Sequence, residues 1–180
     1  MRRSVLIAAS LALSAAATTS VQAQRSLSVG LAGGVSLPSA DLSDGASAGW
    51  HGIGTLWLSS SMQPMGLRVD VAHNRFAFSD EVQAVLGDGD QTTTSATVNL
   101  TYRFPSAGWS ISPYLVTGLG AYRIDCSVGC DASTHYGWNV GLGSRLHLLS
   151  LRSFIEARYH RTGRGDSDVH FFPITLGFLF

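Results

Sequence analysis

The chain ends with the stretch HFFPITLGFLF, which occupies residues 170–180. Every second residue contributes to one apolar face, which consists of Phe172, Ile174, Leu176, Phe178 and Phe180. The positions between them are more mixed and include Pro173, Thr175 and Gly177. Alternation with a period of two is typical of a β-strand. A strand of about ten residues is long enough to cross a bilayer when it is tilted. The sequence therefore predicts a membrane-crossing strand at this point.

The same alternation recurs along the chain. Clear apolar and polar faces alternate in residues 26–37, 66–76, 93–104, 136–146 and 151–160. Residues 50–59 and 111–123 are also strand-like, but both of their faces are apolar or glycine. In the second of these we expect Tyr114, Val116 and Tyr122 to face lipid. Together with the last stretch, these segments predict eight strands.

The connections between the predicted strands alternate between long and short. Long polar segments occupy residues 38–47, 77–91, 125–134 and 161–169, and short ones occupy residues 59–64, 105–109 and 147–150. Of the 12 Asp and Glu residues, only Asp70 and Glu156 lie within predicted strands. Charge is expensive on a surface that faces lipid. The pattern predicts an all-β fold, an eight-stranded antiparallel up-and-down transmembrane β-barrel with four long outer loops and short periplasmic turns.

The N-terminus has the features of a secretory signal peptide. Arg2 and Arg3 precede an uncharged apolar run at residues 5–17, and small residues follow at Val21-Gln22-Ala23. We expect cleavage after Ala23, so that residues 1–23 are the signal peptide and residues 24–180 form one barrel domain. The alternative is a retained membrane anchor. The chain contains no lysine and is nearly neutral, which argues against a nucleic-acid surface.

The polar faces of the predicted strands carry a set of charged and amide side chains, which we expect to point into the barrel. The set is Arg68, Asp70, Asn99, Arg103, Asn139, Arg145, Glu156 and Arg158. An eight-stranded barrel has an interior just wide enough for side chains to fill, and buried charges need partners. The sequence therefore predicts a polar network that closes the lumen. The alternative is a narrow ion pathway that opens when an ion pair breaks.

Aromatic residues lie mostly near the ends of the predicted strands, as in the interfacial girdles of membrane barrels. Trp50, Trp57, Tyr102, Trp138 and Tyr159 are among those that we expect there. Histidines outside the polar set, such as His51, are expected at the surface or the interface.

Cys126 and Cys130 lie in the third long segment. In an exported chain two cysteines are expected to form a disulfide, here one that closes a small loop. A zinc site that includes His135 is an alternative, but the spacing lacks the two ligand pairs of a strong zinc motif. We therefore expect no metal and no cofactor.

Glu156, His160 and Thr162 contain the parts of a hydrolase triad. They would share one face of one strand, too far apart for Glu156 to orient His160 directly. We therefore expect no catalytic residues and no enzyme, with a lipid-modifying enzyme kept as a minor alternative.

The chain resembles the small outer-membrane β-barrel domain proteins of the OmpA, OmpX and opacity-protein type over residues 26–180. The stretches that carry the resemblance are the signal peptide, Pro113-Tyr114, VTGLG at residues 116–120, GWNVGLG at residues 137–143, EARY at residues 156–159 and the terminal Phe178-Leu179-Phe180. The resemblance implies that Phe178 and Phe180 belong to the signal read by the outer-membrane assembly machinery. In the family's signal a glycine is expected at the position that Thr175 occupies here, whereas in this chain the nearby glycine is Gly177.

The function expected from this resemblance is a structural or surface-interaction role in the bacterial outer membrane. The expected partners are outer-membrane lipid and the assembly machinery, the expected state is a monomer, and no external ligand is implied. A small ion or solute pore and a soluble lipocalin-like binder are the remaining alternatives.

Overall fold

The computed structural model describes residues 25–39, 46–60, 62–105, 111–127, 132–148, 151–163 and 169–180. These residues form eight strands and one short helix. The elements are β1 (Arg25–Ser39), β2 (Gly49–Ser60), β3 (Met65–Ala77), α3 (Asp80–Leu86), β4 (Asp90–Arg103), β5 (Ile111–Cys126), β6 (Ser133–Leu148), β7 (Leu151–Thr162) and β8 (Val169–Leu179).

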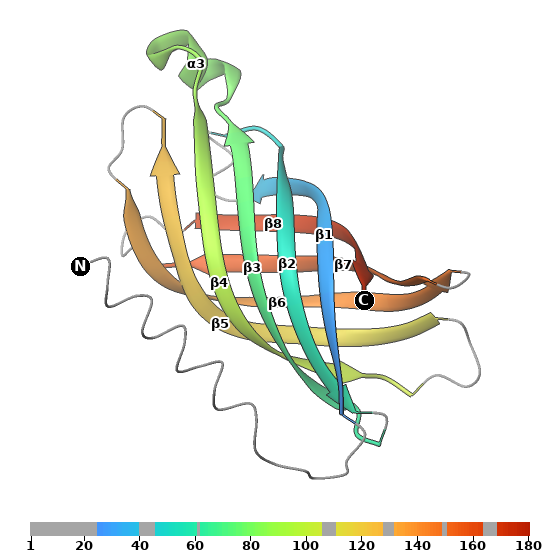
Figure 1. The fold of residues 1–180 in the computed structure, drawn as a ribbon. Coiled ribbons are helices and arrows are strands. Elements are labelled where there is room, and N and C mark those ends of the chain that lie inside the picture. The colour runs from blue at the N-terminus through green and yellow to red at the C-terminus, as the bar shows by residue number, and fades with distance from the viewer. Residues whose placement is uncertain are drawn as a thin grey trace, which may run out of the picture.

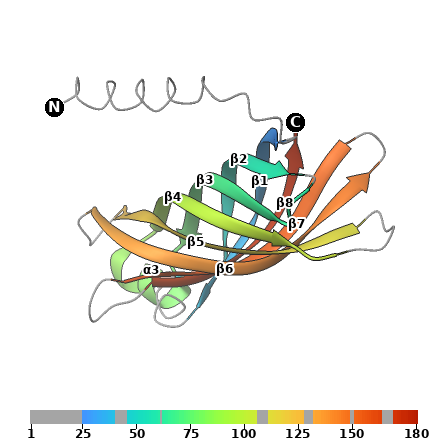
Figure 2. The same ribbon diagram turned by 90° about the horizontal axis from the view of Figure 1, so that it is seen from below.

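Each strand pairs with its neighbours in the sequence, and the sheet closes on itself in the order β1-β2-β3-β4-β5-β6-β7-β8. All eight pairings are antiparallel. The closing pair joins β1 to β8, with a register that runs from Gly30 opposite Leu179 to Ser39 opposite His170. Figures 1 and 2 show the resulting barrel from two directions. The predicted eight-stranded antiparallel up-and-down barrel is therefore confirmed.

The two ends of the barrel differ. One end carries α3 between β3 and β4, and the connections β1–β2, β5–β6 and β7–β8 lie at the same end, which we call the α3 end (Figure 1). The opposite end, where β1 begins and β8 ends, carries the connections at residues 61–64, 104–110 and 149–150, and we call it the turn end. The strands extend up to three residues beyond the predicted ones at the α3 end, so Asp90 and Asp125 lie in strands rather than loops.

Helix α3 was not predicted, because a helix of 7 residues is too short to give a periodic apolar pattern. The signal that could have found it is local. Ser79 occupies the N-cap position, and Asp80 and Glu81 place acidic side chains in the first turn. Gln83 ties the helix to the preceding chain, since its side-chain Nε2 donates to the Phe78 carbonyl oxygen at 2.8 Å. In the described part of the chain no helix is long and apolar enough to cross a membrane.

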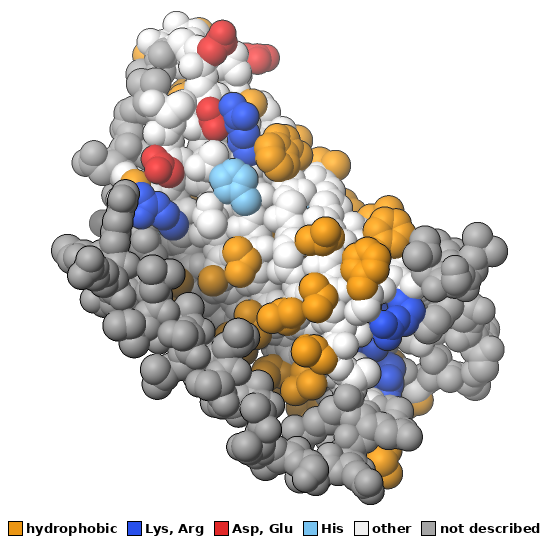
Figure 3. Space-filling view, in the orientation of Figure 1, with side chains coloured by type: hydrophobic (Ala, Val, Ile, Leu, Met, Phe, Trp, Pro, Cys, Tyr) orange, Lys and Arg blue, Asp and Glu red, His pale blue; other side chains and the backbone are white. Residues whose placement is uncertain are grey.

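The strands alternate between a polar inward face and an apolar outward face. On β3, Arg68 and Asp70 are buried, whereas Leu67, Val69 and Val71 are exposed on the outside. Figure 3 shows hydrophobic side chains spread across the middle of one outer face, with the acidic side chains visible on that face toward α3. The arrangement is the reverse of a lipocalin-like barrel in water, which buries its apolar face.

Exposed aromatic side chains lie near both ends of the outer surface. Tyr102, Phe104, Phe178 and Phe180 lie toward the turn end, and Trp50, Tyr136, Trp138 and Phe172 lie toward the α3 end. These two groups match the expected girdles.

Strand β5 has the opposite facing to the one predicted. Tyr114, Val116 and Tyr122 point into the lumen and are 2%, 0% and 0% exposed, whereas Leu119 on the alternate face is 70% exposed. The prediction was wrong because both faces of this strand are apolar or glycine, so hydrophobicity does not distinguish them. Space beside the neighbouring strand decides instead, because Tyr114 and Val116 pair with Gly143 and Gly141 of β6.

Two further residues of β2 were assigned to the wrong environment. Trp57 was expected in a girdle and His51 at the surface, but both point into the lumen, with exposures of 1% and 3%. Both are amphipathic side chains whose polar atoms find partners inside. The Trp57 indole nitrogen donates to Thr101 Oγ1 at 3.3 Å, and His51 contacts Ser36 and Thr175.

Candidate functional site in the barrel lumen

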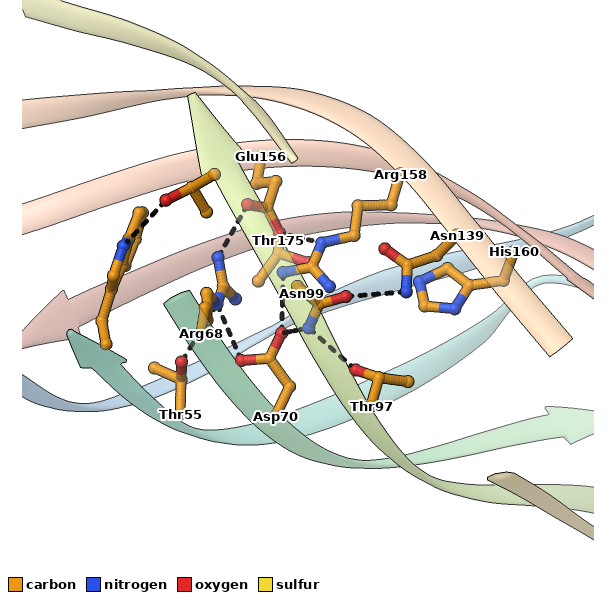
Figure 4. Close-up of polar contacts among 12 residues, drawn as sticks. Thr55, Arg68, Asp70, Thr97, Asn99, Asn139, Glu156, Arg158, His160 and Thr175 are labelled. Atoms are coloured by element: carbon orange, nitrogen blue, oxygen red, sulfur yellow. Dashed lines mark hydrogen bonds and ion pairs between the residues drawn. The ribbon is translucent and has the colours of Figure 1, made fainter. Parts of the chain in front are cut away.

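Four buried charged side chains form a closed ring at the middle of the lumen (Figure 4). Arg68 of β3 donates from Nε to Asp70 Oδ1 at 2.7 Å and from Nη1 to Glu156 Oε2 at 2.8 Å. Arg158 of β7 closes the ring, because it donates to Asp70 Oδ2 at 2.8 Å and also to Glu156 Oε1. We call these four residues the charge ring. Two guanidinium groups and two carboxylates make the ring electrically neutral.

Uncharged side chains from four other strands extend the charge ring. Tyr114 of β5 donates its hydroxyl to Glu156 Oε2 at 2.7 Å, and Thr55 of β2 accepts from Arg68 Nε at 3.0 Å. Asn99 of β4 donates to Asp70 Oδ2 at 3.0 Å and accepts at 2.8 Å from Asn139 of β6. The network therefore joins β2 to β7 across the lumen, and burial of its charges is offset by multiple hydrogen bonds.

The layer above the charge ring, toward the α3 end, contains histidines among aromatic rings. The His160 ring stacks on Phe171 with centroids 4.8 Å apart, and its Nδ1 lies 3.0 Å from the Tyr122 hydroxyl. Across the lumen, His51 Nε2 lies 2.9 Å from Thr175 Oγ1. Beyond this layer, Phe76 packs against Phe171 with centroids 5.8 Å apart.

The layer below the charge ring, toward the turn end, is aromatic. Trp57 packs edge-to-face against Tyr114 and Phe154, with centroids 5.1 and 6.0 Å away. The Arg68 guanidinium lies 4.9 Å from the Trp57 centroid and 5.0 Å from the Phe154 centroid, within the range of a cation–π contact. These rings therefore separate the charge ring from the turn end.

Glycines on neighbouring strands make room for two of these side chains. A Cβ atom at Gly118 would collide with the Asn99 side chain, and one at Gly143 would collide with Tyr114. Each of these glycines therefore leaves room, beside the strand with which it is paired, for a large side chain that points into the lumen.

The space left inside is small. The cavity bounded by His51, Asp70, Asn74 and Arg158 measures about 10 Å³, as does the one beside Trp57. A volume of this size holds at most one water molecule.

The eight residues of the predicted lumen set fall into two groups. Arg68, Asp70, Asn99, Asn139, Glu156 and Arg158 lie together in the network. Arg103 and Arg145 lie apart from it at the turn end, where both line the same pocket. The network also contains Tyr114 and Thr55, which the sequence reasoning missed. The glycines of β6 were the sequence feature that could have indicated an inward position for Tyr114. Nothing in the sequence distinguished Thr55 from other threonines in the strands.

The geometry does not support a hydrolase triad. Both carboxylate oxygens of Glu156 are engaged by Arg68, Arg158 and Tyr114, while His160 bonds to Tyr122. No group of three potential metal ligands occurs among the residues that the structure describes. Cys126 ends β5, but Cys130 lies outside the described residues, as does the predicted signal peptide, so the predicted disulfide and cleavage stay predictions.

Known structures share this fold at low sequence identity. Neisserial surface protein A has a TM-score of 0.63 at 18% identity, with 86% of this chain and 97% of that chain covered. A major outer membrane protein from Thermus thermophilus has a TM-score of 0.58 at 12% identity, covering 86% and 99%. Ail, the attachment invasion locus protein of Yersinia pestis, solved with the heparin analogue sucrose octasulfate, has a TM-score of 0.52 at 19% identity, covering 87% and 97%. None of the curated proteins matches the sequence.

The sequence comparison adds a family assignment to this likeness of fold. The sequence model of one protein family, the outer membrane protein beta-barrel domain, matches residues 6–180, which is nearly the whole chain. The exposed apolar surface, the aromatic girdles and the polar lumen agree with that match. This chain therefore belongs to the outer membrane protein beta-barrel domain family.

Proposed function

We propose that this protein is a structural or surface-interaction barrel of the bacterial outer membrane, with a lumen closed by its own side chains. The family supports the membrane location, and two structural neighbours are named for a surface position and for attachment. The polar network and the aromatic layers support the closed lumen. In this proposal the protein acts through its outer end and not by passing solutes.

We assign the turn end to the periplasm and the α3 end to the outside. Membrane barrels of this kind have short periplasmic turns and longer outer loops. The shortest connections here, residues 61–64 and 149–150, lie at the turn end, and the connection that contains α3 lies at the other. Lipid then contacts the apolar outer surface between the girdles. The exposure of Phe178 and Phe180 at the turn end supports our proposal that they belong to the signal for the assembly machinery.

The single observation that carries the closed lumen is the charge ring. All four of its side chains are at most 4% exposed, and each bonds to two others in the ring. Opening a path through it requires separating buried charges of opposite sign, which leaves uncompensated charges at a high cost in free energy.

Planar-bilayer recording of the refolded protein tests this proposal. We expect the wild-type protein to give no unitary currents. The double variant Arg68→Ser with Glu156→Ser removes two large side chains from the middle of the lumen and is expected to conduct. Steady unitary currents from the wild-type protein would overturn the closed lumen and favour the small pore.

A matched control removes an ion pair that lies outside the lumen. Arg75 and Asp90 pair at 3.0 Å on the outer surface, with side chains 53% and 24% exposed. The double variant Arg75→Ser with Asp90→Ser should remain silent. Conductance from this control would show that loss of any ion pair perturbs the bilayer, and not that the charge ring closes the lumen.

A further inference from the structure

A pocket of about 180 Å³ lies at the turn end of the barrel. Its polar lining consists of three arginines and five serines: Arg103, Arg145, Arg152, Ser26, Ser28, Ser59, Ser112 and Ser153. Leu146 and Leu179 complete it. The pocket is more than ten times larger than the cavities within the lumen, and it lies beyond the aromatic layer of Trp57, Tyr114 and Phe154.

Among the residues that the structure describes, none is an acidic partner of these three arginines. The ion pairs within the described part of the chain use Arg68, Arg75 and Arg158, and none uses Arg103, Arg145 or Arg152. The sequences of the three turns at this end, residues 61–64, 104–110 and 149–150, contain no Asp or Glu. Positive charge is therefore concentrated at this mouth of the barrel, without a carboxylate from the turns to balance it.

Two of the arginines are held in place by neutral groups. The Arg145 guanidinium lies 3.9 Å from the centroid of the Trp57 ring. Arg103 donates from Nη2 to the carbonyl oxygens of Ser60 and Gln63, at 3.2 and 3.4 Å. A guanidinium has five N–H donors, so both side chains keep donors for a ligand. Their positions are set before any ligand arrives, which lowers the entropic cost of binding.

The serines add hydroxyl groups at the same pocket. Ser26 and Ser59, from the paired strands β1 and β2, lie 3.1 Å apart between their hydroxyl oxygens. Ser153 donates to the Leu146 carbonyl oxygen at 3.2 Å. Ser28 and Ser112 also line the pocket. Hydroxyls can donate to an anion that the guanidinium groups attract.

We propose that this pocket binds a phosphate group. Guanidinium groups match the oxygens of a phosphate in geometry and charge, and such charge-assisted hydrogen bonds are stronger than neutral ones. Donors come from β1, β2, β4, β5, β6 and β7 around the pocket, which suits a tetrahedral group with oxygens in several directions better than a planar carboxylate. The phosphate is either a free ion or the headgroup of a phospholipid beside the barrel. Binding here does not depend on whether the lumen conducts.

Nuclear magnetic resonance of the refolded protein in phosphate-free octyl glucoside micelles tests the proposal. The signals to follow are the Nε–H groups of the arginines and the Trp57 indole N–H. Inorganic phosphate is added in one arm, short-chain phosphatidylglycerol in a second, and chloride at equal ionic strength in a third. We expect saturable shifts of Arg145 and Trp57 with phosphate, with phosphatidylglycerol or with both, and none with chloride. If inorganic phosphate produces saturable shifts, the free ion is sufficient for binding. If only phosphatidylglycerol produces them, the pocket binds the lipid headgroup.

Three variants separate binding at this pocket from general attraction of anions. Arg145→Gln and Arg152→Gln are each expected to weaken binding by about tenfold, since each removes a charge-assisted contact. The Arg152 side chain is exposed, so its loss leaves the packed lumen intact. The matched control is Arg123→Gln, an exposed arginine near the α3 end of β5, which should bind as the wild type does. Absence of saturable shifts in both phosphate arms, or equal weakening by Arg123→Gln, would overturn the proposal.

Discussion

At the scale of single residues, the lumen is governed by the need to pair buried charge. Arg68 and Arg158 each contact both Asp70 and Glu156, so no member of the charge ring depends on a single partner. Such a ring adds less to stability than its short distances imply, because desolvation offsets much of the attraction. Removing one charge has a larger effect than this net contribution, since the others remain buried.

Replacing Glu156 with Gln tests whether removal of one charge destabilises the protein by more than the net contribution of the whole ring. The change keeps the shape of the side chain but leaves two buried guanidinium groups with one carboxylate. We expect the free energy of unfolding to fall by about 3–5 kcal/mol. Urea titration of the refolded protein in lipid vesicles, followed by tryptophan fluorescence, measures it.

Asp90→Asn is the matched control for Glu156→Gln, because Asp90 pairs with Arg75 on the outer surface. Its loss should lower the free energy of unfolding by no more than about 1 kcal/mol. If both variants lowered the free energy of unfolding by a similarly small amount, the charge ring would have to be accessible to water.

Single residues also show how far the sequence indicates the arrangement of the lumen. Six of the eight residues predicted to form the lumen set lie in one network. The reason is that a charged or polar residue within an alternating strand is unfavourable on the face that contacts lipid, so it points into the lumen. The sequence could not show that Arg103 and Arg145 lie apart from the other six residues. Alternation indicates which face of a strand a residue occupies, but not how far along the barrel axis its side chain lies from those of other strands. Trp57 was misplaced because an indole suits either a wet interface or a buried layer with a hydrogen-bond acceptor.

At the scale of elements, the number of strands and the facing of β3, β4, β6, β7 and β8 followed from alternation, and the order of the strands followed from the lengths of the connections. Strand β5 did not, because its two faces have nearly equal hydrophobicity and the packing partner decides between them. Tyr114 faces inward where Gly143 leaves room for its ring. That information lies on another strand, and it becomes readable only when the register between the two strands is known.

A charge scan of outward positions tests whether lipid surrounds the strands. Leu176 of β8 lies between Phe172 and Phe178, whereas Met65 begins β3 at the turn end, and their exposures are similar at 50% and 54%. Leu176→Arg should lower the free energy of unfolding in vesicles by about 2–4 kcal/mol, and Met65→Arg by about 0–1 kcal/mol. Equal costs at the two positions would contradict the proposed depth in the bilayer.

At the scale of the whole molecule, the packed lumen and the α3 end are distinct parts of the barrel. Helix α3 stands beyond the strands (Figure 1), and Val85 on it is 81% exposed. The contact of Gln83 with the Phe78 carbonyl is local to this connection. The stability of the barrel is therefore expected to be nearly independent of the sequence of the helix.

Replacing residues 80–86 with an epitope tag of equal length tests both the independence and the orientation. The free energy of unfolding should change by no more than about 0.5 kcal/mol. Antibody should label the tag on intact cells. A tag placed instead in residues 61–64 should be labelled only after the outer membrane is permeabilised, and the reverse result would invert the proposed orientation.

The seam between β1 and β8 constrains the order of events during biogenesis. Val29 and Phe180 exchange two backbone hydrogen bonds, at 3.1 and 2.7 Å, so the first strand is completed by the last residue. Until β8 is in place, β1 and β7 each present a row of unsatisfied amides, which can template aggregation. We therefore expect chains interrupted before this point to depend on periplasmic chaperones and to be cut by proteases, however well their first seven strands are paired.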